Sequence, residues 1–217
     1  EPPELAGQPA ERRRVSEGLV DTLAELHAVD IAAHGLTTLG KPAGFVERQV
    51  RGWSERWSGS QTSELPEMDA LAAWLAERLP PDPARPTVVH GDFKLDNVML
   101  DARDIGHVVA VFDWEMSALG DPLVDLGIVL AYWSPTAPPE QRDALTTITN
   151  RPGYFTPREV VDLIESDPSL TARILETTDW TVAGLDIGSD KIAPFLGQSR
   201  FTYLEGDIAI NKEWIEY

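Results

Sequence analysis

Two short apolar segments on either side of a polar turn constrain the fold of this chain more than any other feature. Residues 98–100 and 107–112 are rich in strand-favouring residues, and residues 101–106 between them are polar and end in glycine. This pattern predicts an antiparallel β-hairpin. A third strand-like run, Thr87-Val88-Val89, precedes the hairpin and leads into a loop with several polar residues.

The predicted hairpin brings two oxygen-bearing side chains together. If its strands pair symmetrically about Ile105, Asn97 lies opposite Asp113, and directly opposed residues of an antiparallel pair have Cα atoms about 4.5–5.5 Å apart. Amide and carboxylate oxygens are hard ligands that suit Mg²⁺, which commonly completes its coordination with water and substrate phosphates. The pair therefore predicts a magnesium site that works on a phosphorylated substrate.

The loop before the hairpin carries residues for proton transfer. Asp92 lies ahead of Asn97 and is left free of the predicted metal site, so it could accept a proton from an acceptor hydroxyl. Lys94 adds a cation near the same phosphate. A metal that neutralises the transferring phosphate and a base that activates a hydroxyl together indicate phosphoryl transfer.

The same residues carry a family resemblance. His90-Gly91-Asp92, with Asn97 and then Asp113-Trp114-Glu115, resembles the catalytic core of the aminoglycoside phosphotransferase and choline kinase group, small-molecule relatives of protein kinases. Residues 119–127 are similar to the next block of that family, and the run from about 2 to 156 most resembles its acyl-CoA-dehydrogenase-associated branch. The resemblance implies an α+β fold, namely the mainly helical C-terminal lobe of a protein-kinase-like enzyme with a catalytic hairpin. It also implies ATP as phosphate donor, Mg²⁺, and a small-molecule hydroxyl substrate.

The resemblance also implies a role for each site residue. By this likeness Asp92 is the catalytic base, Asn97 and Asp113 are metal ligands, His90 braces the loop, and Asp125 holds the loop by hydrogen bonds from the following helix. Lys94 matches a protein-kinase position more than a fixed position of this group.

Other polar residues have a structural interpretation. Asp101, Asp104 and Asp121 are predicted to be turn and cap residues rather than ligands. His27 is predicted to be a packed or capping residue at the end of a helix. The four histidines are scattered and the chain has no cysteine, so disulfides, thiolate catalysis and cysteine-type zinc sites are excluded.

Composition narrows the range of partners. The formal net charge of −18 argues against binding to nucleic acid or to an anionic membrane, and the cluster Arg12–Arg14 is too short to reverse that. No apolar stretch approaches the roughly 20 residues that a transmembrane helix needs. A cytoplasmic location is therefore expected.

Helical periodicity predicts the rest of the lobe. Four helices are expected. The first has Val15, Leu19, Leu23 and Leu26 inward, and the second follows Pro42 with a core stripe of Phe45, Val46, Val50, Trp53 and Trp57. The third covers Pro66–Leu79 with Met68, Leu71, Leu75 and Leu79 inward, and the fourth is a buried central helix over Leu123–Trp133. The aromatic stripe also allows a ligand-stacking role. Thr156-Pro157-Arg158-Glu159 predicts a capping box and a helix through Ile164.

The C-terminal part has a different pattern. Strand-like residues 181–186 and 201–204 flank a short helix over 192–196, which predicts parallel strands and a partial Rossmann-like α/β segment. Residues from about 170 to 217 also resemble NAD-dependent nucleotide-sugar epimerases and decarboxylases. By this likeness Asp186 contacts the ribose of NAD, and Asp207 and Ile208 face the adenine. The glycine loop for the pyrophosphate is absent upstream, so the NAD site is incomplete, and Asp186 is equally well explained as a strand-end acid.

These observations predict two units, residues 1–157 as a kinase-like C-lobe and residues 158–217 as a helix with a Rossmann-like fragment. No lysine that could grip the donor phosphates precedes Lys41, so a missing N-lobe is an expected partner. A second chain that covers the C-terminal segment is the other expected partner. Three functions remain open at this point: a phosphotransferase, a fragment of an NAD-dependent nucleotide-sugar enzyme, and a non-catalytic scaffold or chimera.

Overall fold

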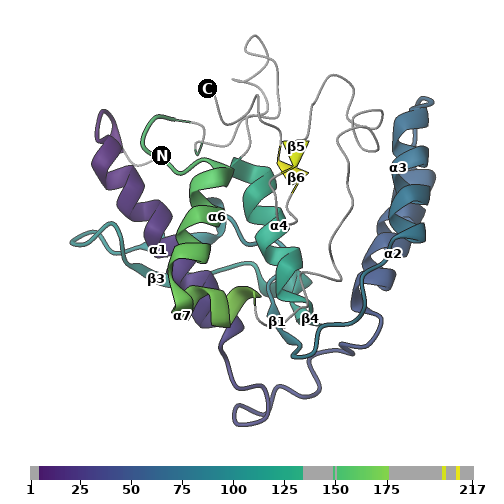
Figure 1. The fold of residues 1–217 in the computed structure, drawn as a ribbon, viewed down its shortest axis with the longest axis horizontal. Coiled ribbons are helices and arrows are strands. Elements are labelled where there is room, and N and C mark those ends of the chain that lie inside the picture. The colour runs from purple at the N-terminus through teal and green to yellow at the C-terminus, as the bar shows by residue number, and fades with distance from the viewer. Residues whose placement is uncertain (1–4, 134–148, 150, 176–201, 204–208, 211–217) are drawn as a thin grey trace.

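The computed structural model describes residues 5–133, 149, 151–175, 202–203 and 209–210. Its helices are α1 (Pro9–His27), α2 (Phe45–Ser60), α3 (Pro66–Glu77), α4 (Pro122–Trp133), α6 (Pro157–Ser166) and α7 (Pro168–Leu170), with the π-helical segment η6 (Thr171–Leu175) and the 3-10 helices η2 (Leu95–Asn97) and η3 (Trp114–Met116). Its strands are β1 (Thr87–Val89), β2 (Val98–Leu100), β3 (Val108–Val111), β4 (Ala118–Gly120), β5 (Thr202–Tyr203) and β6 (Ala209–Ile210). Figure 1 shows α1, α4 and α6 side by side, with α2 and α3 apart from them. The predicted mixture of helix and sheet is confirmed.

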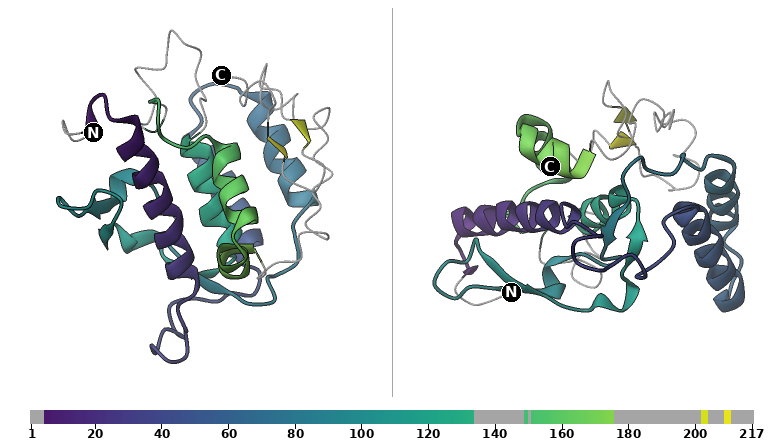
Figure 2. Two further views of the ribbon diagram at one scale, coloured as in Figure 1. Left: turned by 60° about the vertical axis from the view of Figure 1, so that its left-hand side comes forward. Right: turned by 90° about the horizontal axis from the view of Figure 1, so that it is seen from below.

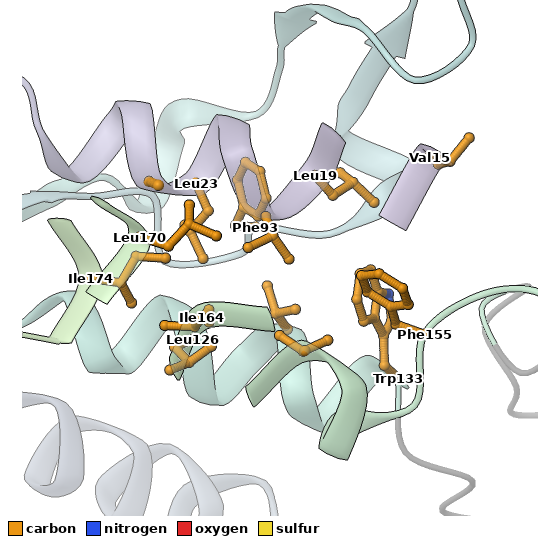
Figure 3. Close-up of a cluster of buried hydrophobic side chains, with 14 of the residues drawn as sticks. Val15, Leu19, Leu23, Phe93, Leu126, Trp133, Phe155, Ile164, Leu170 and Ile174 are labelled. Atoms are coloured by element: carbon orange, nitrogen blue, oxygen red, sulfur yellow. The ribbon is translucent and has the colours of Figure 1, made fainter. Parts of the chain in front are cut away.

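The hydrophobic core lies between α1, α4 and α6 (Figures 2 and 3). Val15, Leu19 and Leu23 of α1 recur every four residues, so they fall on one face, and all three are buried. Leu126 and Trp133 of α4 pack into the same cluster. Full burial of such a side chain stabilises the fold by about 1.5–3 kcal/mol, so this cluster fixes α1 against α4. The buried central helix is confirmed, and so is the inward stripe of α1 for Val15, Leu19 and Leu23, whereas Leu26 is half-buried.

The predicted hairpin forms, but its register differs from the symmetric pairing by one residue. Val98 pairs with Val111, and the backbone N–H of Phe112 donates to the carbonyl of Asn97 at 2.8 Å. Asn97 therefore lies opposite Phe112, and the expectation that it lies opposite Asp113 is wrong. An irregularity between Met99 and Leu100 shifts the ladder, as a β-bulge does when it adds one residue to one strand.

A second antiparallel pair joins β1 to β4, with Val88 opposite Leu119. The sequence did not predict β4, because Ala118 and Gly120 have little strand propensity. This pair closes the segment between the two strands into a loop. The segment between β1 and β4, which contains the predicted loop residues and the hairpin, therefore begins and ends at the same pair of strands.

The α2–α3 pair forms two helices close to the predicted positions, but their predicted inward faces are partly wrong. Trp53, Leu75 and Leu79 have exposed fractions of 53%, 38% and 36%, whereas Trp74 is buried. The two helices contact each other, and Phe45 packs against β4 at the start of α2. Helical periodicity identifies an apolar face but does not identify what covers it.

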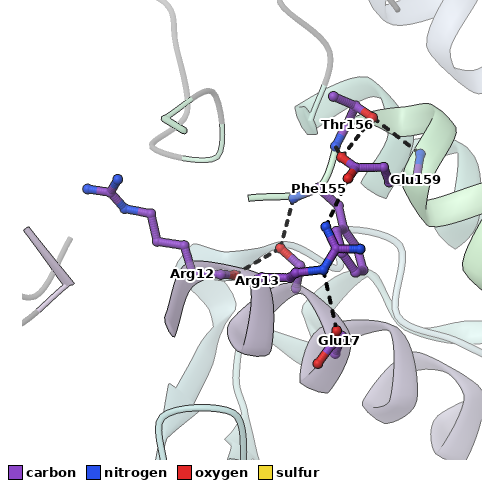
Figure 4. A network of polar contacts seen from close by, with 7 residues as sticks. Arg12, Arg13, Glu17, Phe155, Thr156 and Glu159 are labelled. Atoms are coloured by element: carbon purple, nitrogen blue, oxygen red, sulfur yellow. Dashed lines mark hydrogen bonds and ion pairs between the residues drawn. The ribbon is translucent and has the colours of Figure 1, made fainter. Parts of the chain in front are cut away.

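The predicted capping box at the start of α6 is confirmed, and it joins α6 to α1 (Figure 4). The Thr156 hydroxyl accepts from the Glu159 backbone N–H at 3.2 Å, and the Thr156 N–H donates to the Glu159 carboxylate at 2.9 Å. Arg13 of α1 donates to the same carboxylate at 2.9 Å. Next to it, the Phe155 N–H donates to Ser16 Oγ at 3.0 Å. These contacts hold the start of α6 on α1.

The described C-terminal strands form an antiparallel pair that the sequence did not predict, whereas the parallel pairing predicted between residues 181–186 and 201–204 stays a prediction. Thr202 and Tyr203 of β5 pair antiparallel with Ile210 and Ala209 of β6. Only residues 204–208 connect them, and so short a connection suits antiparallel strands, because parallel strands need a crossover of about a dozen residues or more. The predicted strand 181–186 and helix 192–196 lie outside the described residues. No Rossmann-like unit is seen in the part of the chain that the structure describes.

No helix among the described residues is both long enough and apolar enough to span a membrane.

Candidate active site

The catalytic loop, residues 90–97, begins where β1 ends. His90 is fully buried, and its Nε2 lies 2.8 Å from the carbonyl oxygen of Phe112. Since a carbonyl can only accept, Nε2 carries the hydrogen, and Nδ1 is then free to accept from the backbone N–H of Asp92 at 3.2 Å. The neutral imidazole therefore links the loop to the end of β3, which fits the expected bracing role of His90.

Asp125 of α4 holds the backbone of the loop. Its Oδ2 accepts from the N–H of His90 and its Oδ1 from the N–H of Gly91, both at 2.8 Å, and its side chain is fully buried. Gly91 has φ +83°, and a Cβ there would lie 2.8 Å from the carbonyl oxygen of Met116. Only glycine fits this position without strain. The hydrogen bonds predicted between the loop and Asp125 are thus present, with the loop's N–H groups as donors.

His27 also contacts the Asp125 carboxylate. Its Nε2 lies 3.2 Å from Asp125 Oδ2, and both side chains are fully buried. Its Nδ1 is buried and has no hydrogen-bond partner among the described residues. A hydrogen on Nδ1 would be left unsatisfied, so the arrangement favours the neutral imidazole that donates through Nε2. His27 is packed, as predicted, but its contact with Asp125 was not foreseen.

Three side chains surround the carboxylate of Asp92. Lys94 Nζ lies 2.6 Å and Asn97 Nδ2 3.1 Å from Oδ2, while Tyr132 Oη lies 3.4 Å from Oδ1. The side chains of Asp92 and Lys94 are 24% and 21% exposed, so a substrate can still reach them. The hydrogen bond that Lys94 donates to Asp92 raises the pKa of Lys94 above its ordinary value, against the effect of burial and with a further contribution from Tyr132. Lys94 is therefore a firmly protonated cation beside the predicted base.

The two predicted metal ligands have different surroundings. Asn97 is buried in η2, and its Nδ2 also donates to the carbonyl oxygen of Asp92 at 2.9 Å. Its amide hydrogens are thereby used, which leaves the side-chain oxygen for a cation. Asp113 follows β3 with φ 66°, the left-handed region, and is the one non-glycine residue with positive φ among those described. Such a backbone conformation in a non-glycine residue is uncommon and is concentrated at functional sites.

The set Asn97 and Asp113 fits Mg²⁺ in its chemistry, because both supply oxygen donors and this ion needs few protein ligands. The described residues contain no cluster of three or more His, Cys, Asp or Glu side chains that could form a complete metal cage. The predicted NAD contacts Asp186, Asp207 and Ile208 lie outside the described residues and stay a prediction.

One site residue was missed by sequence reasoning. Tyr132 follows Asp125 by seven residues on α4, or about two helical turns, so both face the same loop. That spacing was available in the sequence. It carried no meaning until the loop and the helix were known to be in contact.

Comparison with known proteins agrees with this geometry. The model of the phosphotransferase enzyme family matches residues 1–160. The chain belongs to this family. A phosphotransferase fold is also found in a putative aminoglycoside phosphotransferase from Ralstonia eutropha, which is 31% identical with a TM-score of 0.65, over 86% of this chain and 53% of that one. An aminoglycoside-3'-phosphotransferase of type VIII shares the fold at 20% identity, with a TM-score of 0.52 over 86% of this chain and 59% of that one.

Curated relatives of this phosphotransferase domain are much longer proteins. Acyl-CoA dehydrogenase family member 11 of Rattus norvegicus is 41% identical over 132 residues, which are 60% of this chain and 17% of that protein. Acyl-CoA dehydrogenase family member 10 of Mus musculus is 38% identical over 139 residues, or 63% of this chain and 13% of that protein. The chain thus spans less than a fifth of the length of these relatives, and the resemblance to the acyl-CoA-dehydrogenase-associated branch is confirmed.

Proposed function

We propose that this domain transfers the γ-phosphate of ATP to a hydroxyl group of a small molecule, with Asp92 as the general base. The observation that carries the proposal is the arrangement at Asp92. Lys94 and Asn97 occupy Oδ2, and Oδ1 is approached only by Tyr132 among the described residues. A carboxylate held at one oxygen and accessible at the other suits proton abstraction from an incoming hydroxyl.

These groups account for each bond, proton and leaving group of the proposed reaction. The acceptor oxygen forms a bond to the γ-phosphorus as the bond from that phosphorus to the bridging oxygen of ADP breaks. The acceptor proton passes to Asp92, and ADP leaves. Lys94 compensates the charge of Asp92 in the resting state, and as a cation beside the base it would also stabilise the charge that spreads over the phosphoryl oxygens. Asn97 and Asp113 would hold Mg²⁺, which when bound neutralises phosphate charge.

An N-terminal lobe is part of this proposal. Kinase-like enzymes grip the donor phosphates with a lysine from a separate lobe. The Ralstonia eutropha structure extends well beyond the 53% of its length that this chain covers. We therefore propose that an N-lobe, from a longer protein or from a second chain, completes the ATP site.

Transfer of the terminal phosphate from labelled ATP tests the base. The assay uses the chain alone and the chain fused to the N-lobe of the Ralstonia eutropha relative, with aminoglycosides and hydroxylated acyl-CoA thioesters as acceptors, as the relatives' names suggest. Asp92→Asn should lower the rate by about 10²–10⁴-fold, since this is the usual contribution of general base catalysis. Asp96→Asn is the matched control, because Asp96 is an exposed acid in the same loop. Full activity of Asp92→Asn would contradict the assignment.

A further inference from the structure

Helix α4 contacts the catalytic loop at two levels. Asp125 binds the loop's backbone, through the N–H groups of His90 and Gly91. Two turns later Tyr132 contacts the loop's side chains instead. Its hydroxyl lies 3.4 Å from Asp92 Oδ1 and 3.4 Å from Lys94 Nζ. One rigid helix therefore positions both the path of the loop and its reacting groups.

The ring of Tyr132 also contacts Lys94. The ammonium nitrogen lies 5.1 Å from the ring centroid, within the range of a cation–π interaction. Tyr132 itself is fixed at the end of α4, where its backbone carbonyl accepts from the Thr149 hydroxyl at 3.1 Å. The ring and the hydroxyl of Tyr132 thus both contact the lysine that pairs with Asp92.

The distance from Tyr132 to Asp92 has a mechanistic meaning. At 3.4 Å it exceeds the 2.5–3.0 Å of an ordinary O–H···O hydrogen bond, whereas Lys94 and Asn97 bind Oδ2 at normal distances. Catalytic hydrogen bonds are often long before the substrate binds and shorten in the complex. Oδ1 is therefore the oxygen whose partner can still change.

We infer that Tyr132 is a positioning residue for phosphoryl transfer: it orients the Asp92 carboxylate so that Oδ1 meets the acceptor hydroxyl, and it keeps Lys94 against Oδ2. The inference rests on the proposed function, since it assigns Asp92 as the base. Tyr132 acts through Asp92 and Lys94. The part of its effect on catalysis that passes through Asp92 must therefore vanish when Asp92 is replaced.

The first test needs no activity. NMR titration of the Lys94 ammonium group in the chain compares the unaltered protein with Tyr132→Phe, which keeps the ring and removes the hydroxyl. The pKa of Lys94 should fall, because one of the hydrogen bonds that raise it is lost. Tyr154→Phe is the control, since Tyr154 is a buried tyrosine that lies near Arg12 and not near Lys94, and it should leave the Lys94 titration unchanged. An unchanged titration in Tyr132→Phe would overturn the inference.

The second test uses the transfer assay with the N-lobe fusion. Tyr132→Phe should lower kcat by about tenfold, equivalent to about 1.4 kcal/mol, and leave the KM for ATP unchanged. In the Asp92→Asn background the same substitution should cause no further loss, because residues that act through one group are not additive. A further loss in that background would contradict the inference that Tyr132 acts on the reaction by orienting Asp92. If the unaltered fusion transfers no phosphate to any acceptor, the proposed function fails, while the Lys94 titration still decides whether Tyr132 holds the pair.

Discussion

The catalytic loop and the α2–α3 pair are held in different ways. The loop depends on a few buried polar atoms, above all the Asp125 carboxylate, which accepts from two backbone N–H groups and lies beside His27. The α2–α3 pair depends on contact between its own helices, and Trp53 on its surface is half exposed. A buried hydrogen-bonded group cannot be replaced without leaving its partners unsatisfied, whereas an exposed helix tolerates most changes. Substitution of a single buried polar side chain at the loop should therefore lower the stability of the protein strongly, whereas most substitutions on the surface of α2–α3 should not.

The largest effect is expected for Asp125→Ala. The substitution leaves the N–H groups of His90 and Gly91 and the donor of His27 without an acceptor in the core, and each buried unsatisfied group costs about 1–3 kcal/mol. The free energy of unfolding should fall by at least about 3 kcal/mol, measured by urea denaturation. Asp162→Ala is the control, since Asp162 is a surface acid paired with Arg158 and its loss should change stability by less than about 1 kcal/mol. Similar losses in both variants would erase the distinction between loop and surface.

The next largest effect is expected for two helix glycines, whose replacement by alanine should change the stability of the protein in opposite directions. A Cβ at Gly18 of α1 would lie 2.0 Å from the carbonyl oxygen of Gly106 in the hairpin turn, whereas a Cβ at Gly52 of α2 would meet nothing closer than 3.8 Å. Gly18→Ala should destabilise the protein by about 1–3 kcal/mol through overpacking. Gly52→Ala should stabilise it by up to about 1 kcal/mol, because alanine favours the helix. Thermal unfolding measures both, and a stabilising Gly18→Ala would mean that α1 does not press on the hairpin.

The smallest effect concerns the joint between α1 and α6, which is polar but partly exposed. Burial acts to raise the pKa of Glu159, but hydrogen bonds from Thr156 and Arg13 outweigh it and lower that pKa below 4.5. A carboxyl with a lowered folded-state pKa stabilises the protein above its unfolded pKa, and this contribution is lost as the pH falls through the folded pKa. Glu159→Gln should therefore lower Tm at pH 7, and the difference from the unaltered protein should shrink below pH 4.5. A difference that does not depend on pH would rule out this charge as its cause.

Elements that depend on neighbouring residues were predicted well from the sequence. Features that depend on contacts between distant residues were not. The capping box at Thr156 needs only four neighbouring residues, and it was predicted correctly. The hairpin was predicted too, but its register was wrong by one residue. The pairs next to the turn, Leu100 with Val108 and Asp101 with His107, are centred on Asp104 rather than on Ile105, and the irregularity between Met99 and Leu100 makes up only part of this shift. The exposed Leu75 and Leu79 were expected inside, because periodicity does not say whether a second surface covers a helix face.

The candidate site shows the same limit. His90, Asp92, Lys94 and Asn97 were found from one short motif, and the structure joins them in one hydrogen-bonded network. His27 is 98 residues from Asp125, and Tyr132 is 40 residues from Asp92. No local sequence pattern predicts either contact.

Asp125 holds the catalytic loop by its backbone rather than by its side chains, and this affects which substitutions the loop can accept. Asp125 grips peptide N–H groups, which every residue except proline possesses, so the anchor does not read the side chains that the loop presents. Positions such as Lys94 are then free to be exchanged for other chemistry while the loop keeps its path. The scaffold and the reactivity can be altered separately, and a laboratory selection for new acceptors could randomise the loop's outward side chains with Asp125 and Gly91 left in place.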